Sequence, residues 1–215
     1  MAKAPAKETL LLTGPAGRLE ALLELPDLQE PPRRVAVLCH PHPQHQGTML
    51  NKVVHTLART MTDLGVPALR FNFRGVGASD GSYADGDGEV DDLLAVCAWA
   101  RTRWPGAELW LAGFSFGGVI AARAAADAGA ARLVSIAPAV NILGRALAQI
   151  PTMPWLIVQG DADDIVPVEE VEAFVAECAA GQQAHPELIV MPGVGHFFHG
   201  HLVDLRRTLV ERLAE

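Results

Sequence analysis

The sequence predicts an α/β fold with a mainly parallel central sheet and helices on both faces. Short apolar runs typical of buried strands alternate with longer stretches in which apolar residues recur at spacings of three and four, as in amphipathic helices. In addition, the apolar run Leu109–Ala112 passes through the turn Gly113–Gly118 directly into an Ala-rich helical stretch. Such strand–turn–helix units build doubly wound parallel sheets.

The elements of the N-terminal half follow from the same criteria. An interior parallel strand is buried on both faces and forms a continuous apolar run, whereas a surface helix has one apolar stripe. Glycines and other turn residues mark where segments end. The expected elements are a hairpin of Thr9–Leu12 and Arg18–Leu25, a strand over Val35–Cys39, a helix over Thr48–Leu64, a strand over Val66–Phe73 and a helix over Gly88–Arg103.

The C-terminal half continues the alternation without internal repeats. Its expected strands are Leu109–Ala112, Arg132–Ile136, Trp155–Gln159 and Glu187–Met191, and its expected helices are Gly117–Ala128, Val168–Ala179 and His201–Ala214. The length of 215 residues is enough for one substantial hydrophobic core. We therefore expect residues 1–215 to form a single domain.

The turn at residues 113–118 has the pattern G-x-S-x-G, with Ser115 at its centre. A strand that turns at once into a helix strains the backbone of the serine, and side chains two residues to either side would collide. The glycines relieve that collision, and the turn exposes the hydroxyl near a helix N-terminus, where developing negative charge is favoured. The pattern predicts that Ser115 is a nucleophile.

A serine hydroxyl needs a base to remove its proton and a carboxylate to orient that base. After this type of turn, the carboxylate is expected to come first along the chain and the histidine second. The polar turn 161–167, with three aspartates, follows one apolar strand, and His196 follows the next. Both positions lie just beyond the C-terminal end of a strand, where open α/β sheets bind ligands.

The chain resembles the α/β-hydrolase superfamily, and within it the small, cap-less bacterial serine esterases related to dienelactone hydrolases. The matching stretches run through nearly the whole chain and are Cys39–Pro43, Arg70–Gly77, Gly113–Gly118, Gly160–Pro167 and Gly195–His199. The resemblance implies an α/β-hydrolase fold without a large cap domain. It also implies that the acid lies three residues after the strand-ending Gly160, at Asp163, with Asp164 as the alternative and Asp161 as a turn residue.

The resemblance further implies an oxyanion hole made of two backbone amides. One belongs to the residue after the nucleophile, Phe116, and the other to the loop after the strand ending at Cys39. Pro41 and Pro43 have no N–H, so we expect His42 to be the second donor. The alternative that the histidines of this loop bind zinc is disfavoured, because their spacing matches no common zinc motif, and no metal is expected.

Composition restricts the partners. The net charge of −8 argues against nucleic acid, no apolar run is long enough to span a membrane, and the N-terminus shows no secretory signal. Three cysteines without paired spacing are typical of thiols in a reducing compartment, so a cytoplasmic protein is expected. The chemistry requires no cofactor, and oligomeric state is left open.

The sequence offers several candidates for residues that contact the substrate. Phe114, Met153, Trp155 and Phe197 are candidates for an acyl pocket, and a short helix within residues 137–154 could cover the site. Arg74, beside Asp80, Asp85 and Asp87, is expected to hold a glycine-rich loop through a salt bridge, with recognition of a substrate carboxylate as the alternative.

The expected function is hydrolysis of small or short-chain carboxylic esters through an acyl-enzyme, with Ser115, His196 and Asp163 as the triad. The alternatives are a thioesterase or other acyl hydrolase that uses the same triad, or a non-catalytic binding protein on the same fold.

Overall fold

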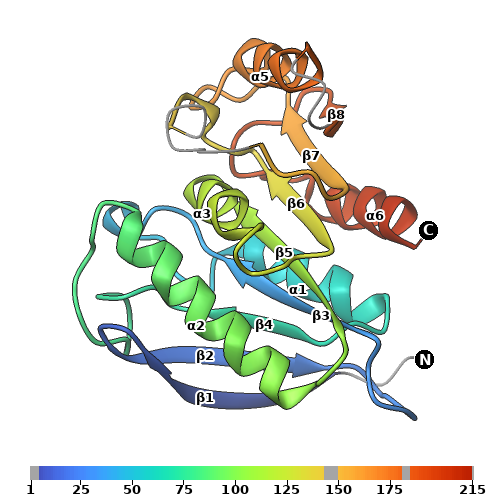
Figure 1. The fold of residues 1–215 in the computed structure, drawn as a ribbon. Helices are drawn as coiled ribbons and strands as arrows, with labels where there is room; N and C mark the ends of the chain where they lie inside the picture. The colour runs from blue at the N-terminus through green and yellow to red at the C-terminus, as the bar shows by residue number, and fades with distance from the viewer. Residues whose placement is uncertain (1–4, 143–149, 181–184, 215) are drawn as a thin grey trace.

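The computed structural model describes residues 5–142, 150–180 and 185–214 (Figure 1). These residues form an eight-stranded sheet with the order β1-β2-β4-β3-β5-β6-β7-β8. The strands are β1 (Ala6–Gly14), β2 (Gly17–Leu25), β3 (Arg34–Cys39), β4 (Ala68–Phe71), β5 (Glu108–Phe114), β6 (Arg132–Ile136), β7 (Trp155–Gly160) and β8 (Glu187–Met191). β1 and β2 pair antiparallel, as do β2 and β4. The six strands from β3 to β8 are parallel to one another, so the predicted fold class is confirmed.

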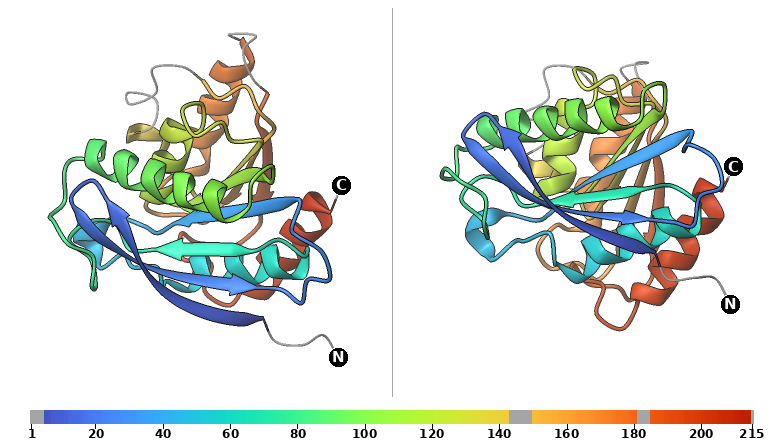
Figure 2. Two further views of the ribbon diagram at one scale, coloured as in Figure 1. Left: turned by 60° about the horizontal axis from the view of Figure 1, so that its bottom comes forward. Right: turned by 90° about the horizontal axis from the view of Figure 1, so that it is seen from below.

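Helices cover both faces of the sheet (Figures 1 and 2). On one face α1 (Lys52–Asp63) and α6 (Leu202–Leu213) pack over one apolar core. On the other face α2 (Asp87–Arg103), α3 (Phe116–Ala124) and α5 (Val168–Ala180) pack over a second. The central strands are therefore buried on both sides, which explains their continuous apolar sequences.

The parallel register gathers several loops at one edge of the sheet. The last residue of β3, Cys39, is paired with Gly113 near the end of β5, and the last residues of β7 and β8, Gly160 and Met191, are paired with each other. The segments that follow these strands carry His42, Ser115, Asp163 and His196. They leave the sheet on the same side, as is general for sites in α/β folds.

Most predicted elements are observed with shifted ends. The helix expected from Thr48 begins at Lys52, because the side chain of Asn51 accepts a hydrogen bond from Val53 N and caps it there. The hairpin turn consists of two residues, because Gly14 and Gly17 still pair. Of the stretch 137–154, in which a short helix was expected, residues 143–149 lie outside the described residues.

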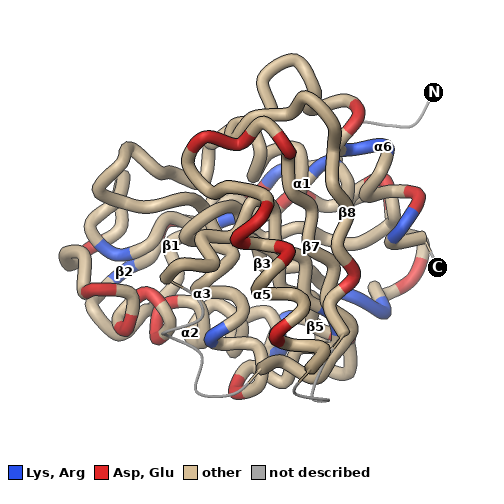
Figure 3. Tube along the Cα trace, turned by 90° about the horizontal axis from the view of Figure 1, so that it is seen from above, with Lys and Arg blue, Asp and Glu red and all other residues tan. Residues whose placement is uncertain are grey.

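Charged positions of both signs are interspersed along the trace (Figure 3). Several form ion pairs between elements, including Arg206 with Asp63 and Arg212 with Glu187. In the described part of the chain, no helix combines the length and the apolar character needed to cross a membrane.

Candidate active site

Ser115 lies at a strained turn between β5 and α3. Its backbone has φ of 53° and ψ of −119°, which non-glycine residues rarely adopt, and its amide donates to Ile136 O at 2.9 Å. A Cβ atom on Gly113 would lie 2.2 Å from the carbonyl oxygen of Gly117, so a side chain at position 113 would be incompatible with the turn. The steric reason for the G-x-S-x-G pattern is thus present, and the half-buried serine precedes the first turn of a helix.

Gly117 packs directly against the segment that follows β3. A Cβ atom there would lie 2.4 Å from Cys39 O and 2.5 Å from His40 O. This close approach brings the rings of Phe116 and His42 to a centroid distance of 4.7 Å. Within the described residues, neither the Phe116 nor the His42 amide donates a backbone hydrogen bond. Both amides are therefore available to a ligand.

The loop after β3 is held in a tight turn around His42. The amides of His45 and Gly47 both donate to His42 O at 3.0 Å, and Pro43 begins a short 3₁₀ helix, Pro43–His45. The ring uses Nδ1 to accept from Gln44 N and lies with Nε2 3.3 Å from the hydroxyl of Tyr83. Tyr83, which the sequence had not indicated, thus connects this loop to the segment before α2.

His40 is a buried structural residue. Its Nδ1–H lies 2.6 Å from Pro41 O, and its Nε2 accepts from Phe73 N at 3.1 Å. Burial lowers the pKa of His40 to about 4, so the ring is neutral at pH 7. With both ring nitrogens in use, His40 has no lone pair for a metal. In the portion that the structure describes, no group of three His, Cys, Asp or Glu side chains is arranged to hold an ion.

Asp163 and His196 form a buried pair. Asp163 Oδ2 accepts from His196 Nδ1 at 2.8 Å, while Oδ1 accepts from the amides of Ile165 and Val166 at 2.9 and 2.8 Å. Burial alone would raise the pKa of Asp163, but the hydrogen bonds from His196 and the two amides outweigh it and lower the pKa. The carboxylate is therefore ionised at neutral pH, whereas Asp164 beside it is exposed.

Gln159 also positions this carboxylate, and the sequence reasoning missed it. It is the penultimate residue of β7 and is fully buried. Its Nε2 donates to Asp163 Oδ2 at 2.9 Å and to Val166 O at 2.8 Å. A polar residue in the otherwise apolar run Trp155–Gly160 was the signal that could have identified it.

The acid loop and the histidine loop are tied together. Asp161 accepts a hydrogen bond from Gly193 N at 2.6 Å, and Ala162 N donates to Val194 O at 3.1 Å. A Cβ atom on Gly160 would lie 2.0 Å from Val194 O, so the backbones are in close contact. These contacts set the separation of Asp163 and His196 before any substrate binds.

The His196 ring lies beside the serine turn through Phe114. The Phe114 ring, one residue before Ser115, has its centroid 5.0 Å from that of His196. Among the hydrogen bonds of the described residues, none joins Ser115 and His196. Such hydrogen bonds are often loose in ligand-free enzymes and tighten when substrate binds.

The pocket candidates require correction. Trp155 is the first residue of β7, at the opposite edge of the sheet from Asp163, where it donates to Ser135 Oγ and packs against Phe174. Met153 precedes it and packs against the same core. Phe114 is fully buried and supports His196 instead of contacting solvent. Of the four, Phe197 alone is exposed, and it borders a depression of about 300 Å³.

Arg74 has a structural role, with a partner different from those expected. Its guanidinium forms a double hydrogen bond with the buried Asp92 of α2 at 3.0 and 2.8 Å. Asp80 instead pairs with Arg18, and Asp87 with Arg123. Arg74 therefore holds its loop against α2.

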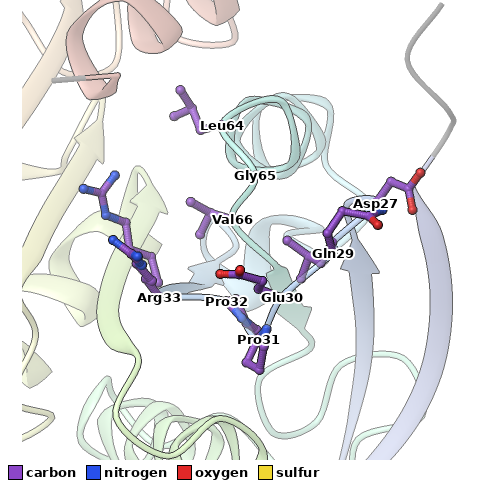
Figure 4. A pocket seen from close by; sticks show the side chains of 11 residues that line it. Asp27, Gln29, Glu30, Pro31, Pro32, Arg33, Leu64, Gly65 and Val66 are labelled. Atoms are coloured by element: carbon purple, nitrogen blue, oxygen red, sulfur yellow. The ribbon is translucent and has the colours of Figure 1, made fainter.

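A second depression has a volume of about 530 Å³ (Figure 4). It is formed by residues 27–34 and 64–66, where β3 begins and α1 has ended. Because β3 runs from this edge toward His42, the depression lies at the opposite end of the sheet from Ser115.

Comparison with known proteins gives consistent matches. Residues 30–151 match the sequence profile of a family described as serine aminopeptidase, S33. An uncharacterised protein of Rickettsia prowazekii is 36% identical over 212 residues, which are 95% of this chain and 87% of that protein.

Solved structures match over the same extent. An α/β serine hydrolase homologue from Coxiella burnetii is 48% identical with a TM-score of 0.88, covering 96% of this chain and 97% of that one. An α/β serine hydrolase without a lid from Xanthomonas campestris is 42% identical with a TM-score of 0.87, covering 99% of this chain and 96% of that one.

Proposed function

This chain belongs to the α/β serine hydrolases, and on that premise we propose that it is a carboxylesterase that cleaves small or short-chain esters through an acyl-enzyme. The observation that carries the proposal is the buried pair of Asp163 and His196 beside the strained Ser115 turn. A carboxylate bound to Nδ1–H leaves Nε2 as the free base, which is the tautomer that serine activation requires.

The reaction proceeds in two stages. In acylation, Ser115 Oγ bonds to the ester carbonyl carbon while His196 Nε2 takes the hydroxyl proton. The tetrahedral intermediate then loses the alcohol as the C–O bond breaks, and the proton passes from His196 to the leaving oxygen. In deacylation, the oxygen of a water molecule bonds to the acyl carbon while His196 Nε2 takes a proton from it. The bond between the acyl carbon and Ser115 Oγ then breaks, His196 returns the proton to Oγ, and the carboxylic acid leaves.

The amides of Phe116 and His42 stabilise the oxyanion of both intermediates. Their support is the contact between the Phe116 and His42 segments and the absence of other backbone acceptors for these amides within the described residues. Removal of one such donor in other enzymes costs about 100- to 1,000-fold in kcat.

A small ester suits the dimensions of the accessible site. Ser115 is half-buried, and the depression that Phe197, the residue after His196, helps to line has a volume of about 300 Å³, at the small end of ligand pockets. The acidic chain also favours a small-molecule substrate over nucleic acid. We place this activity in the cytoplasm, with the three buried cysteines present as free thiols in support.

The test is release of p-nitrophenol from acetate, butyrate and octanoate esters by the protein and by Ser115→Ala purified identically. We expect turnover to fall by several orders of magnitude in the variant, with shorter chains preferred by the parent protein. Equal rates in both proteins would refute Ser115 as the nucleophile. Turnover of the matching acyl thioesters with little ester cleavage would select the thioesterase alternative.

If neither ester nor thioester is cleaved, a fluorophosphonate probe distinguishes the remaining cases. Labelling of the parent protein but not of Ser115→Ala would show an activated serine that acts on another acyl group. Lack of labelling would favour a non-catalytic binding protein.

A further inference from the structure

The depression beside His196 is a defined feature of the molecular surface. It lies between the start of α1 and the segment that follows His196, and its volume is about 300 Å³. Leu50, Lys52, Phe197 and His199 contribute to its lining. Of these four residues, only Phe197 was predicted from the sequence to line a pocket.

Two apolar side chains line this depression and are exposed to solvent. Leu50 has 67% of its surface exposed and Phe197 has 45%, and because both line one depression they form an exposed apolar patch. The Phe197 ring is held in place, since it meets the His196 ring edge-on at 5.1 Å and stacks on His199 at 5.7 Å. Through Phe197, the apolar wall therefore contacts the ring of His196, the proposed catalytic base.

The charge of the depression differs from that of the whole molecule. The chain carries a net charge of −8, yet the described lining residues include Lys52 and no aspartate or glutamate. Lys52 is the exposed first residue of α1, which has no acidic residue in its first turn. The cation and the helix N-terminus together favour an anion at this end of the depression.

The proposed chemistry determines which part of the substrate lies here. His196 Nε2 must reach the oxygen of the departing alcohol, so the group attached to that oxygen lies on the histidine side of the carbonyl. Phe197 follows His196 directly, contacts its ring and lines the depression. The acyl group, by contrast, stays on Ser115 after the alcohol leaves.

We infer that the depression is the leaving-alcohol subsite, and that it takes an apolar alcohol bearing an anionic group, with Leu50 and Phe197 against the apolar part and Lys52 beside the anion. This inference rests on the proposed ester hydrolysis. It narrows the substrate class from short-chain esters in general to esters of acidic alcohols or phenols.

The test compares 4-acetoxybenzoate with its neutral methyl ester, methyl 4-acetoxybenzoate. Both form the same acetyl-enzyme, so their kcat/KM values report the leaving group. We expect Lys52→Gln to reduce the ratio of kcat/KM for the anionic ester to that for the neutral ester by up to about fivefold, the range of one exposed ion pair, and Lys52→Glu to reduce it further. Phe197→Ala should lower kcat/KM for both esters.

Matched controls remove the same groups elsewhere. Arg212→Gln loses an exposed cation near the start of β8, at the opposite edge of the sheet, and Leu11→Ala loses an exposed apolar side chain on β1. Both should retain the parent ratio. An unchanged ratio in Lys52→Gln and Lys52→Glu would overturn the inference. A Lys52 effect confined to a carboxylate on the acyl side, tested with phenyl hydrogen succinate against phenyl butyrate, would also overturn it.

A binding measurement separates this inference from the proposed function. Calorimetric titration of Ser115→Ala with 4-hydroxybenzoate, the departing phenol itself, requires no turnover. Binding that Lys52→Glu abolishes would support the subsite even if no ester were cleaved. Ester cleavage by the parent protein without such binding would leave the esterase proposal intact and refute the subsite.

Discussion

Replacement of Asp163 by asparagine tests the assignment of the acid most directly. Asp163 Oδ2 accepts hydrogen bonds from His196 Nδ1 and Gln159 Nε2, and Oδ1 accepts from two backbone amides. An asparagine must place its NH₂ group at one of these two positions. In either orientation a donor faces donors, so at least one buried hydrogen-bonding group loses its partner.

The expected magnitude follows from these contacts. If the NH₂ group faces His196, the ring must accept on Nδ1 and carry its proton on Nε2, where it cannot receive the proton of Ser115. Loss of the correct tautomer costs about 10⁴-fold in kcat in serine proteases, equivalent to about 5 kcal/mol. The unsatisfied buried group adds about 1–3 kcal/mol of destabilisation.

The assay is kcat/KM for p-nitrophenyl acetate, with thermal unfolding followed in parallel to confirm that each variant is folded. Asp164→Asn is the matched control, because Asp164 is adjacent in sequence but exposed, and it should stay within about twofold of the parent protein. If Asp163→Asn retained a tenth of the activity, or if Asp164→Asn were the inactive variant, the reasoning would be refuted.

Three further predictions concern neighbouring positions. Gln159→Leu should lower kcat by about 10-fold or more and destabilise the fold by about 1–3 kcal/mol, because Asp163 loses a hydrogen-bond donor and Val166 O loses its partner. Steady-state kinetics and urea unfolding measure the two effects, and unchanged values in both would contradict the positioning role. Gly117→Ala should destabilise the fold by about 1–3 kcal/mol and reduce activity, since its Cβ would lie 2.4 Å from Cys39 O. Gly118→Ala, whose Cβ would meet only ordinary contacts from 3.4 Å, should be neutral or slightly stabilising in the same urea unfolding assay. Equal effects of the two substitutions would argue against the packing described. His40, with its pKa lowered to about 4, stabilises the fold in its neutral form above pH 6.5, and about 3 kcal/mol of that stability should be lost as the pH falls toward 4; NMR titration of its ring protons gives the midpoint, and a value above 6 would be incompatible.

The sequence predicted the fold and the order of the site residues because both depend on local patterns. Strand–helix alternation requires only hydrophobic periodicity, and the turn around Ser115 requires glycines for a steric reason that the structure shows at Gly113 and Gly117. Asp163 was selected over its neighbours by resemblance. Its buried environment, made by the amides of Ile165 and Val166, depends on the conformation of the turn and could not be calculated from composition.

The prediction that Trp155 and Met153 line an acyl pocket was wrong for a topological reason. Trp155 and Met153 were chosen for their apolar character near the acid in sequence, but they precede β7 whereas the acid follows it. A six-residue strand spans about 20 Å, so its two ends lie at opposite edges of the sheet. The direction of the strand, known from the parallel arrangement, should have excluded both.

Buried polar contacts between segments that are distant in sequence could not be predicted from the sequence either. Arg74 was paired with acidic residues close to it in sequence, whereas its partner Asp92 lies on the inner face of α2. Because a surface helix normally buries its apolar face and exposes its polar face, the sequence predicts that a carboxylate such as Asp92 faces solvent. The fold instead buries it where a guanidinium compensates its charge, which becomes evident only when the loop and helix are placed together.

The described contacts divide the proposed machinery into two preassembled parts. Asp163 and His196 belong to loops joined through Gly160, Asp161 and Val194, and these joining contacts do not involve the turn that carries Ser115. Ser115 is fixed instead by β5, α3 and the segment after β3. The rings of Phe114 and His196 bring the two parts together without a hydrogen bond between serine and histidine. We therefore expect substrate binding to adjust the distance between Ser115 Oγ and His196 Nε2, and a group bound beside Phe197 would touch the residue whose ring packs against His196.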